Sequence, residues 1–186
     1  DARSRWLLEV VTVPVVWVLF GLVIVVAAVR ARRSDVALQV GLVAVAGLYV
    51  LAGALVNAAY LMRGDDYATF AQGSSFAFVR DTWASVVVPH HHVWIGLLVA
   101  FEATVGVLVL LGRRARTIGL VAAIVFHVLL VSFGWGFALW SAPMVVALVL
   151  LLRAARRRPE ALASWGGAGT SRPASGAPRR RTLHGF

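Results

Sequence analysis

The chain has 186 residues, of which 60% are hydrophobic and 14% are charged. A soluble domain is about half apolar and about a quarter charged, so this composition excludes an ordinary soluble protein and predicts an integral membrane protein. The absence of cysteine excludes disulfides, cysteine-ligated metal or iron–sulfur sites and thiol catalysis within the chain. The net charge of +10 comes from arginine alone. In a membrane protein basic residues first report topology, so we expect no nucleic-acid partner.

Five apolar stretches are long enough to predict membrane spans. The first covers residues 6–29 and is too long for a secretory signal, so we expect it to be retained. The second and third cover residues 36–61 and 93–111. One helix over residues 118–152 would be roughly 50 Å long, against a hydrocarbon core of about 30 Å. Gly134, Gly136 and Pro143 supply a break, which predicts a fourth and a fifth span joined by a turn near residues 134–141.

Arginine clusters give an independent prediction of topology. They follow the first span (Arg30, Arg32, Arg33), the third (Arg113, Arg114, Arg116) and the fifth (Arg153, Arg156, Arg157, Arg158). All three clusters share one side of the membrane only if the number of crossings is odd. Because basic residues are retained on the cytoplasmic side, we expect a protein of the cytoplasmic (inner) membrane, with its N-terminus outside and its C-terminus in the cytoplasm.

Glu102 and His127 are ionisable residues inside predicted spans. A charged side chain near the bilayer centre costs roughly 2.5 to 3.5 kcal/mol on insertion scales, so it usually faces a partner or a cavity. Both residues lie about 15 Å from the arginine turn between the third and fourth spans, which predicts a hydrogen-bonded or ionic pair. Such a pair suits proton exchange with a quinone headgroup or a step in a proton path. It equally suits a structural clamp between two helices, and the sequence leaves both interpretations open.

Further polar residues are candidates for the same site or for a second one. Tyr49 lies at a comparable depth on the second span and Asn57 lies nearer its outer end, so each is either a ligand contact or a bond between helices. His90, His91 and His92 follow a proline at the outer start of the third span, where helix N–H groups can receive a carbonyl or an anion. Successive helical residues point about 100° apart, so we predict no metal site here.

The outer loop, residues 63–92, mixes aromatic and small polar residues. Its aromatic residues are Tyr67, Phe70, Phe76, Phe78 and Trp83. This mixture is typical of a segment lying in the membrane interface. The loop is expected to be either a lid over a pocket between the second and third spans or a plain connector.

Residues 153–186 are rich in arginine, glycine, serine and proline and cannot bury a core, so we expect a disordered cytoplasmic tail. The tail either binds anionic lipid or an acidic partner, or is solvated and reinforces the topology.

Residues 36–152 resemble the DoxX-like family of small four-helix membrane proteins. The resemblance is carried by residues 40–47 with Gly53, by the aromatic loop ending at Pro89, by Phe101, Glu102 and Gly106, and by Leu110 to Arg114. It implies a four-helix bundle, preceded here by an extra span. It also implies association with quinone-linked oxidation or with membrane redox complexes, with Glu102 as the site residue that carries over.

We therefore expect an all-α integral membrane bundle of about five helices. It would comprise an N-terminal span with its turn (residues 1–35), the four-helix unit (36–152) and the tail. The function we expect is that of a membrane subunit of a redox-linked complex, with quinone as the implied cofactor and a protein partner or a homo-oligomer in the bilayer. The alternatives are a small proton-coupled transporter and a structural or assembly subunit. The sequence shows no nucleophile triad, phosphate loop or closed metal-ligand set, so it does not establish that the chain is an enzyme by itself.

Overall fold

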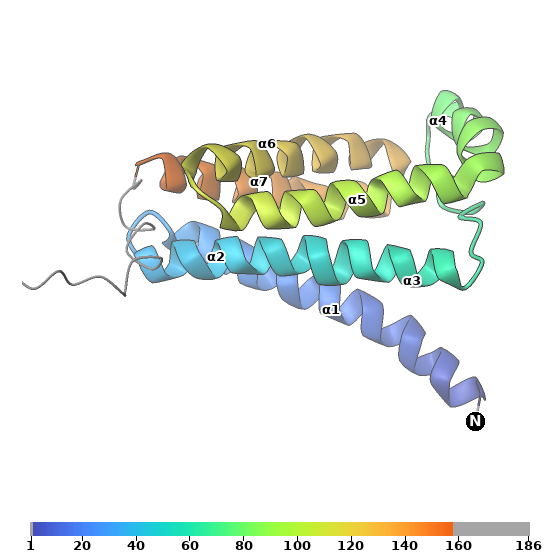
Figure 1. Cartoon of the computed structure of the whole chain (residues 1–186), viewed down its shortest axis with the longest axis horizontal. Coiled ribbons are helices and arrows are strands. Elements are labelled where there is room, and N and C mark those ends of the chain that lie inside the picture. The colour runs from blue at the N-terminus through green and yellow to red at the C-terminus, as the bar shows by residue number, and fades with distance from the viewer. Residues whose placement is uncertain (1, 158–186) are drawn as a thin grey trace, which may run out of the picture.

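The computed structural model describes the backbone of residues 2–157 and the side chains of residues 14–157. Throughout this part of the chain the regular structure is helical, arranged as an up-and-down bundle (Figure 1). Four helical stretches there are long and apolar enough to cross a membrane, and residues Pro14–Arg30 form a shorter apolar stretch of the first helix. The predicted all-α membrane bundle is confirmed, and the protein is a multi-pass membrane protein. The predicted disordered tail began at residue 153, but residues 153–157 continue the last helix, and the remainder of the tail lies outside the described residues.

The first two spans are α1 (Ala2–Arg30) and a continuous helix made of α2 (Asp35–Gly47), η1 (Leu48–Leu55) and α3 (Val56–Met62). Ser34 caps the start of α2, because its side chain accepts a hydrogen bond from the N–H of Ala37 at 3.2 Å. The middle segment η1 is π-helical. A π-helical stretch has wider turns than an α-helix and is often found at functional sites.

The third span begins earlier than the sequence predicts. Residues 63–76 connect the second span without helix, and a helical run then starts at Ala77. The run comprises α4 (Ala77–Thr82), the π-helical η2 (Trp83–Val87), the single-turn η3 (Val88–His90) and α5 (His91–Leu110). Half of the predicted outer loop is therefore helical.

The last two spans are α6 (Arg113–Leu130), continued by the single-turn η4 (Val131–Phe133), and α7 (Trp135–Arg157). The break between them falls at Gly134, whose φ of 134° is a conformation that side-chain-bearing residues rarely adopt. A Cβ there would also lie 2.5 Å from the carbonyl oxygen of Gly73. Pro143, predicted to belong to the break, lies inside α7 instead. The turn between the last two spans is shorter than predicted, because the chain reverses its direction at a single glycine.

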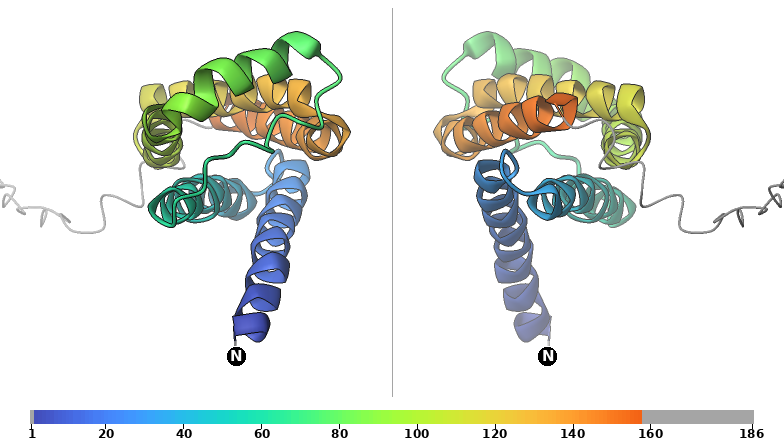
Figure 2. Two further views of the ribbon diagram at one scale, coloured as in Figure 1. Left: turned by 90° about the vertical axis from the view of Figure 1, so that its right-hand side faces the viewer. Right: turned by 90° about the vertical axis from the view of Figure 1, so that its left-hand side faces the viewer.

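Within residues 2–157 the five long helices close into a ring: α1 packs on α2, the second span on α5, α5 on α6, α6 on α7, and α7 on α1 (Figure 2). The buried centre is apolar, with fully buried side chains such as Ile24, Leu38, Val109 and Leu148. Small residues allow close helix contacts, as is usual in membrane bundles. A Cβ on Gly106, for example, would lie 2.5 Å from Cγ2 of Val50.

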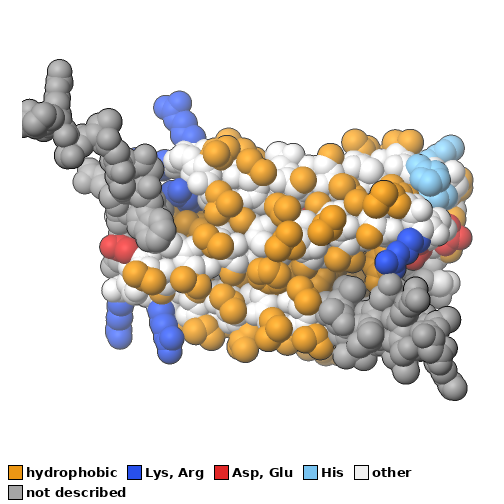
Figure 3. Space-filling view, turned by 60° about the horizontal axis from the view of Figure 1, so that its bottom comes forward, with side chains coloured by type: hydrophobic (Ala, Val, Ile, Leu, Met, Phe, Trp, Pro, Cys, Tyr) orange, Lys and Arg blue, Asp and Glu red, His pale blue; other side chains and the backbone are white. Residues whose placement is uncertain are grey.

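The two ends of the bundle differ in charge (Figure 3). The arginine end carries the ends of α1 and α7 and the turn between α5 and α6, with Arg30, Arg32, Arg33, Arg113, Arg114, Arg116, Arg153, Arg156 and Arg157. The histidine end carries His90, His91, His92 and the segment 63–76. The three described arginine clusters therefore share one end, as an odd number of crossings requires.

Candidate functional site

A small cavity of about 80 Å³ lies inside the bundle, toward the histidine end. It is lined from all five long helices and from segment 63–76. Its lining residues are Trp17, Leu48, Tyr49, Gly53, Asn57, Tyr67, Phe70, Trp83, Ile95, Leu98, Glu102, Phe126, His127, Leu130, Phe137 and Trp140. The cavity thus has aromatic walls and a few polar groups, the composition typical of a ligand site.

Glu102 lies on α5 and is 5% exposed. Its Oε2 accepts a hydrogen bond of 2.9 Å from the side-chain amide of Asn57 on α3. Its Oε1 lies so close to the second span that a Cβ on Gly53 would be 2.7 Å away. A glycine at position 53 therefore makes room for the carboxyl group, and the amide of Asn57 holds it in place.

The π-helical segment η1 forms the wall of the cavity next to Glu102. The turns of a π-helix are wider than those of an α-helix, and one backbone carbonyl of this segment accepts a hydrogen bond from another helix. The indole N–H of Trp17 on α1 donates to the carbonyl of Ala52 at 2.8 Å. The hydroxyl of Tyr49 donates to the carbonyl of Ala123 on α6 at 3.3 Å. These bonds fix α1 and α6 against the irregular segment.

His127 lies on α6 and is 3% exposed. Its Nδ1 is 3.5 Å from the hydroxyl of Ser141, a fully buried residue of α7. Its Nε2 has no hydrogen-bond partner among the described residues. A buried polar atom without a partner costs about 1 to 3 kcal/mol, so a ligand that bonds Nε2 recovers this free energy. The ring of Tyr49 meets the imidazole edge to face, at 6.2 Å between centroids.

The expected direct pair of Glu102 and His127 does not form. Both side chains line one cavity, as their equal depth predicts, but in the described part of the chain each bonds another group: Asn57 for the carboxyl and Ser141 for the imidazole. Equal depth along two helices does not fix the direction in which each side chain points around its helix axis. The two residues therefore stand as separate polar groups in one cavity rather than as a clamp between α5 and α6.

Segment 63–76 and the start of the third span close the cavity toward the histidine end. The hydroxyl of Tyr67 donates to the carbonyl of Asn57 at 3.0 Å, and the indole N–H of Trp83 donates to the carbonyl of Tyr67 at 2.8 Å. Phe70 stacks on Trp83 with ring centroids 5.0 Å apart. Burial, followed by the charges of Asp65 and Glu102, raises the pKa of Tyr67 to about 12, so its hydroxyl remains a donor at physiological pH.

The histidine triplet lies apart from this cavity. His90, His91 and His92 are absent from its lining, and Nδ1 of His91 lies 2.9 Å from the carbonyl oxygen of Val88. The rings of His91 and His92 are 4.2 Å apart. Among the described residues no group of three or more histidine or acidic side chains is placed to hold a metal ion.

The side chains that sequence reasoning did not place at the site include Trp17 and Trp140, which line the cavity, and Ser141, which contacts His127. The sequence alone could have indicated Ser141, because it is a lone polar residue in an apolar span. No such indication exists for the two tryptophans, since tryptophan is generally enriched in membrane proteins at both membrane–water interfaces.

Comparison with known proteins gives no relative. No family model, no curated protein and no solved structure matches this chain. Function therefore has to be argued from the cavity.

Proposed function

We propose that this chain is a membrane subunit of a redox-linked complex and that its cavity binds the ring of a quinone. The observation that carries the proposal is the buried, unpartnered Nε2 of His127, a residue that lines the same cavity as Glu102. A quinone ring presents two carbonyl oxygens and two flat apolar faces. The cavity offers groups of matching chemistry: an imidazole nitrogen, a carboxyl group and aromatic walls.

The chemistry assigned to the chain is proton exchange and positioning. Reduction of a quinone to a quinol consumes two electrons and two protons. In this proposal the electrons come from a partner subunit, since cysteine-ligated clusters cannot form in a chain without cysteine. Glu102 delivers one of the two protons to an oxygen of the ring, the second proton comes from water, and Nε2–H of His127 donates a hydrogen bond to the other ring oxygen. Asn57 is a positioning residue, because its amide fixes the carboxyl group.

The cavity is too small to hold a quinone ring unless its wall moves. A volume of about 80 Å³ holds only a few water molecules, at about 30 Å³ for each. A substituted ring therefore requires a displacement of the cavity wall. Segment 63–76 is the part that we assign to this movement, because it is an irregular connection whose hold on the second span includes the bond from Tyr67 to Asn57.

Binding can be measured with a short-chain quinone such as decylubiquinone, added to the purified full chain in lipid nanodiscs. Quinones quench tryptophan fluorescence, and Trp17, Trp83 and Trp140 line the cavity. We expect saturable quenching that weakens about tenfold in Glu102→Leu and in His127→Phe, the effect of losing one hydrogen bond of about 1.4 kcal/mol. Thr104→Val is the matched control, because Thr104 lies exposed on α5 and bonds within its own helix. Quenching that is unsaturable, or equal in all variants, would reject the proposal.

A proton-coupled carrier is the second candidate, favoured by the π-helical segment Leu48–Leu55 in the wall of the cavity. Transporter sites commonly form where a span is irregular near the middle of the membrane. Proteoliposomes that enclose a pH-sensitive dye distinguish the two functions. A carrier changes the internal pH when substrate is added without any electron donor, whereas a redox subunit requires its partner and a donor.

The membrane orientation and the family resemblance belong to the same proposal. The clustering of the described arginines at one end supports a cytoplasmic arginine end, with the N-terminus outside. The DoxX-like resemblance of residues 36–152 supports a redox association. Reporter fusions at both ends of the bundle test the orientation directly.

A further inference from the structure

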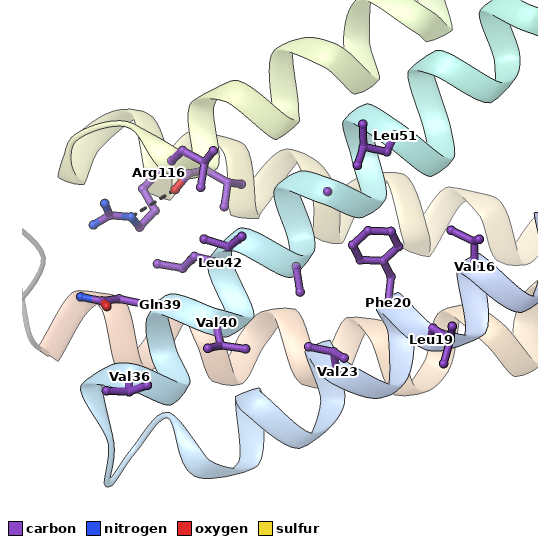
Figure 4. Close-up of a pocket in the computed structure, with 15 residues that line it drawn as sticks. Val16, Leu19, Phe20, Val23, Val36, Gln39, Val40, Leu42, Leu51 and Arg116 are labelled. Atoms are coloured by element: carbon purple, nitrogen blue, oxygen red, sulfur yellow. Dashed lines mark hydrogen bonds between the residues drawn. The ribbon is translucent and has the colours of Figure 1, made fainter. Parts of the chain in front are cut away.

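A second concave site lies on the outside of the bundle, away from the cavity that holds Glu102. It is a groove of about 870 Å³ between α1, the second span and the arginine end of α5 and α6 (Figure 4). Its volume falls in the range of small-molecule sites, about 300 to 1,000 Å³. The groove shares no lining residue with the inner cavity, so an inference about it is independent of the proposed function.

The groove has one polar end. Gln39 and Arg116 lie at that end, whereas Val16, Leu19 and Leu51 lie at the other (Figure 4). The remaining wall is apolar, with exposed side chains such as Val43, which is 62% exposed. A site with one cationic end and a long apolar body matches an anionic amphiphile.

Arg116 is fixed in place at the polar end. Its Nε donates to the carbonyl of Val109 at 3.2 Å, and one terminal nitrogen donates to the carbonyl of Leu111 at 2.8 Å. A guanidinium group has five N–H donors, so these two bonds among the described residues leave others for a phosphate oxygen. The exposed Arg113 and Arg114 begin the same helix but lie outside the lining of the groove, so Arg116 is the arginine that we assign to it.

The length of the groove fits one membrane leaflet. Val36 and Leu51, both in its lining, are fifteen residues apart on the second span, or about 22 Å at 1.5 Å per residue. One leaflet contributes about 15 Å of hydrocarbon. The groove therefore runs from the headgroup level to beyond the middle of the bilayer, which is sufficient for a whole acyl chain.

From these observations we infer that the groove binds one anionic phospholipid. An acyl chain lies along α1 and the second span, and Arg116 bonds the phosphate of the headgroup. The ligand is a lipid of the arginine-side leaflet, and the site is selective for headgroup charge.

Native mass spectrometry of the full chain in detergent tests the inference, with phosphatidylglycerol and phosphatidylcholine of identical acyl chains as the probes. We expect the first phosphatidylglycerol to bind about fivefold more tightly than phosphatidylcholine, the effect of one arginine near an anionic headgroup. Arg116→Gln abolishes this preference. Arg114→Gln removes the same charge from the same turn, lies outside the groove lining and retains the preference.

A second pair of variants tests the apolar part of the groove and does not depend on Arg116. Val43→Trp fills the groove and weakens the binding of the first lipid of either kind. Val146→Trp is the matched control on α7, since Val146 is 60% exposed and lies outside the groove. Equal binding of the two lipids, equal effects of the two arginine variants, or no effect of Val43→Trp would overturn the inference. A dimer that Val43→Trp dissociates would also overturn it, because a second copy of the chain would then occupy the groove.

Discussion

Gly53→Ala is the substitution that tests most sharply how the inner cavity is built. A Cβ at this position would lie 2.7 Å from Oε1 of Glu102 and 2.8 Å from its Cδ. Both distances are below any ordinary contact, so the carboxyl group has to move. It is the flexible end of its side chain, and it moves by giving up the 2.9 Å bond from Asn57. The substitution therefore disorganises the site without forcing the helices apart.

The expected change in the free energy of unfolding follows from a comparison with Gly96→Ala. Gly96 lies on α5, and a Cβ added there would have no neighbour within 4 Å, so its substitution carries only the general preference of alanine for a helix, about 1 kcal/mol. Gly53→Ala gains a similar preference but loses a buried hydrogen bond and crowds the cavity. The expected difference in the free energy of unfolding between the two variants is about 1 to 3 kcal/mol.

The assay is unfolding of each variant in mixed detergent micelles, followed by circular dichroism, with decylubiquinone binding measured on the same samples. We expect Gly53→Ala to be the less stable variant and to bind the quinone at least about tenfold more weakly, since Glu102 is displaced. Equal stability of the two variants, together with unchanged quinone binding by Gly53→Ala, would refute the assigned position of Glu102.

Three further predictions concern the surroundings of the site. Gly106→Ala crowds Val50 and should lower the free energy of unfolding by about 1 to 3 kcal/mol in the same unfolding assay; an unchanged value would contradict the close packing of α5. Ser141→Ala leaves Nδ1 of His127 without its partner and should cost about 1 to 3 kcal/mol, whereas a neutral effect would show that the 3.5 Å contact contributes nothing. The pKa of Tyr67 is raised to about 12, so its contribution to stability is complete below pH 10 and is lost as the pH rises toward 12. Absorbance titration at alkaline pH should show a phenolate transition near pH 12 that Tyr67→Phe removes, and its persistence in that variant would contradict the assignment.

Sequence reasoning correctly predicted the features that depend only on position along the chain or on depth in the membrane. Span length and the spacing of arginines are properties of the chain alone, and they predict the bundle and the clustering of the described arginines at one end. The depth of Glu102 and His127 follows from the rise per helical residue, and both residues do line one cavity. Tyr49 was predicted at a comparable depth and Asn57 nearer the outer end of the second span, each as a candidate for the same site, and both line that cavity.

Sequence reasoning failed for the contacts that depend on how a helix is rotated about its own axis. The partner of Glu102 is Asn57 rather than His127, because close packing at Gly53 and Gly106 sets how α5 is turned against the second span. The π-helical segment Leu48–Leu55 could not be predicted, since its residues are equally suited to an ordinary α-helix. Trp17 also escaped prediction, because its role depends on how α1 packs against that segment.

The central claim is that the inner cavity binds a quinone for a redox partner. Its most direct test is gentle detergent extraction of the native protein, followed by mass spectrometry of every protein and lipid that co-purifies. We predict recovery of a quinone together with an oxidoreductase, and loss of the quinone from Glu102→Leu and His127→Phe while the partner protein is retained. Recovery of the chain alone or as a bare oligomer, with neither quinone nor redox partner, would contradict the claim.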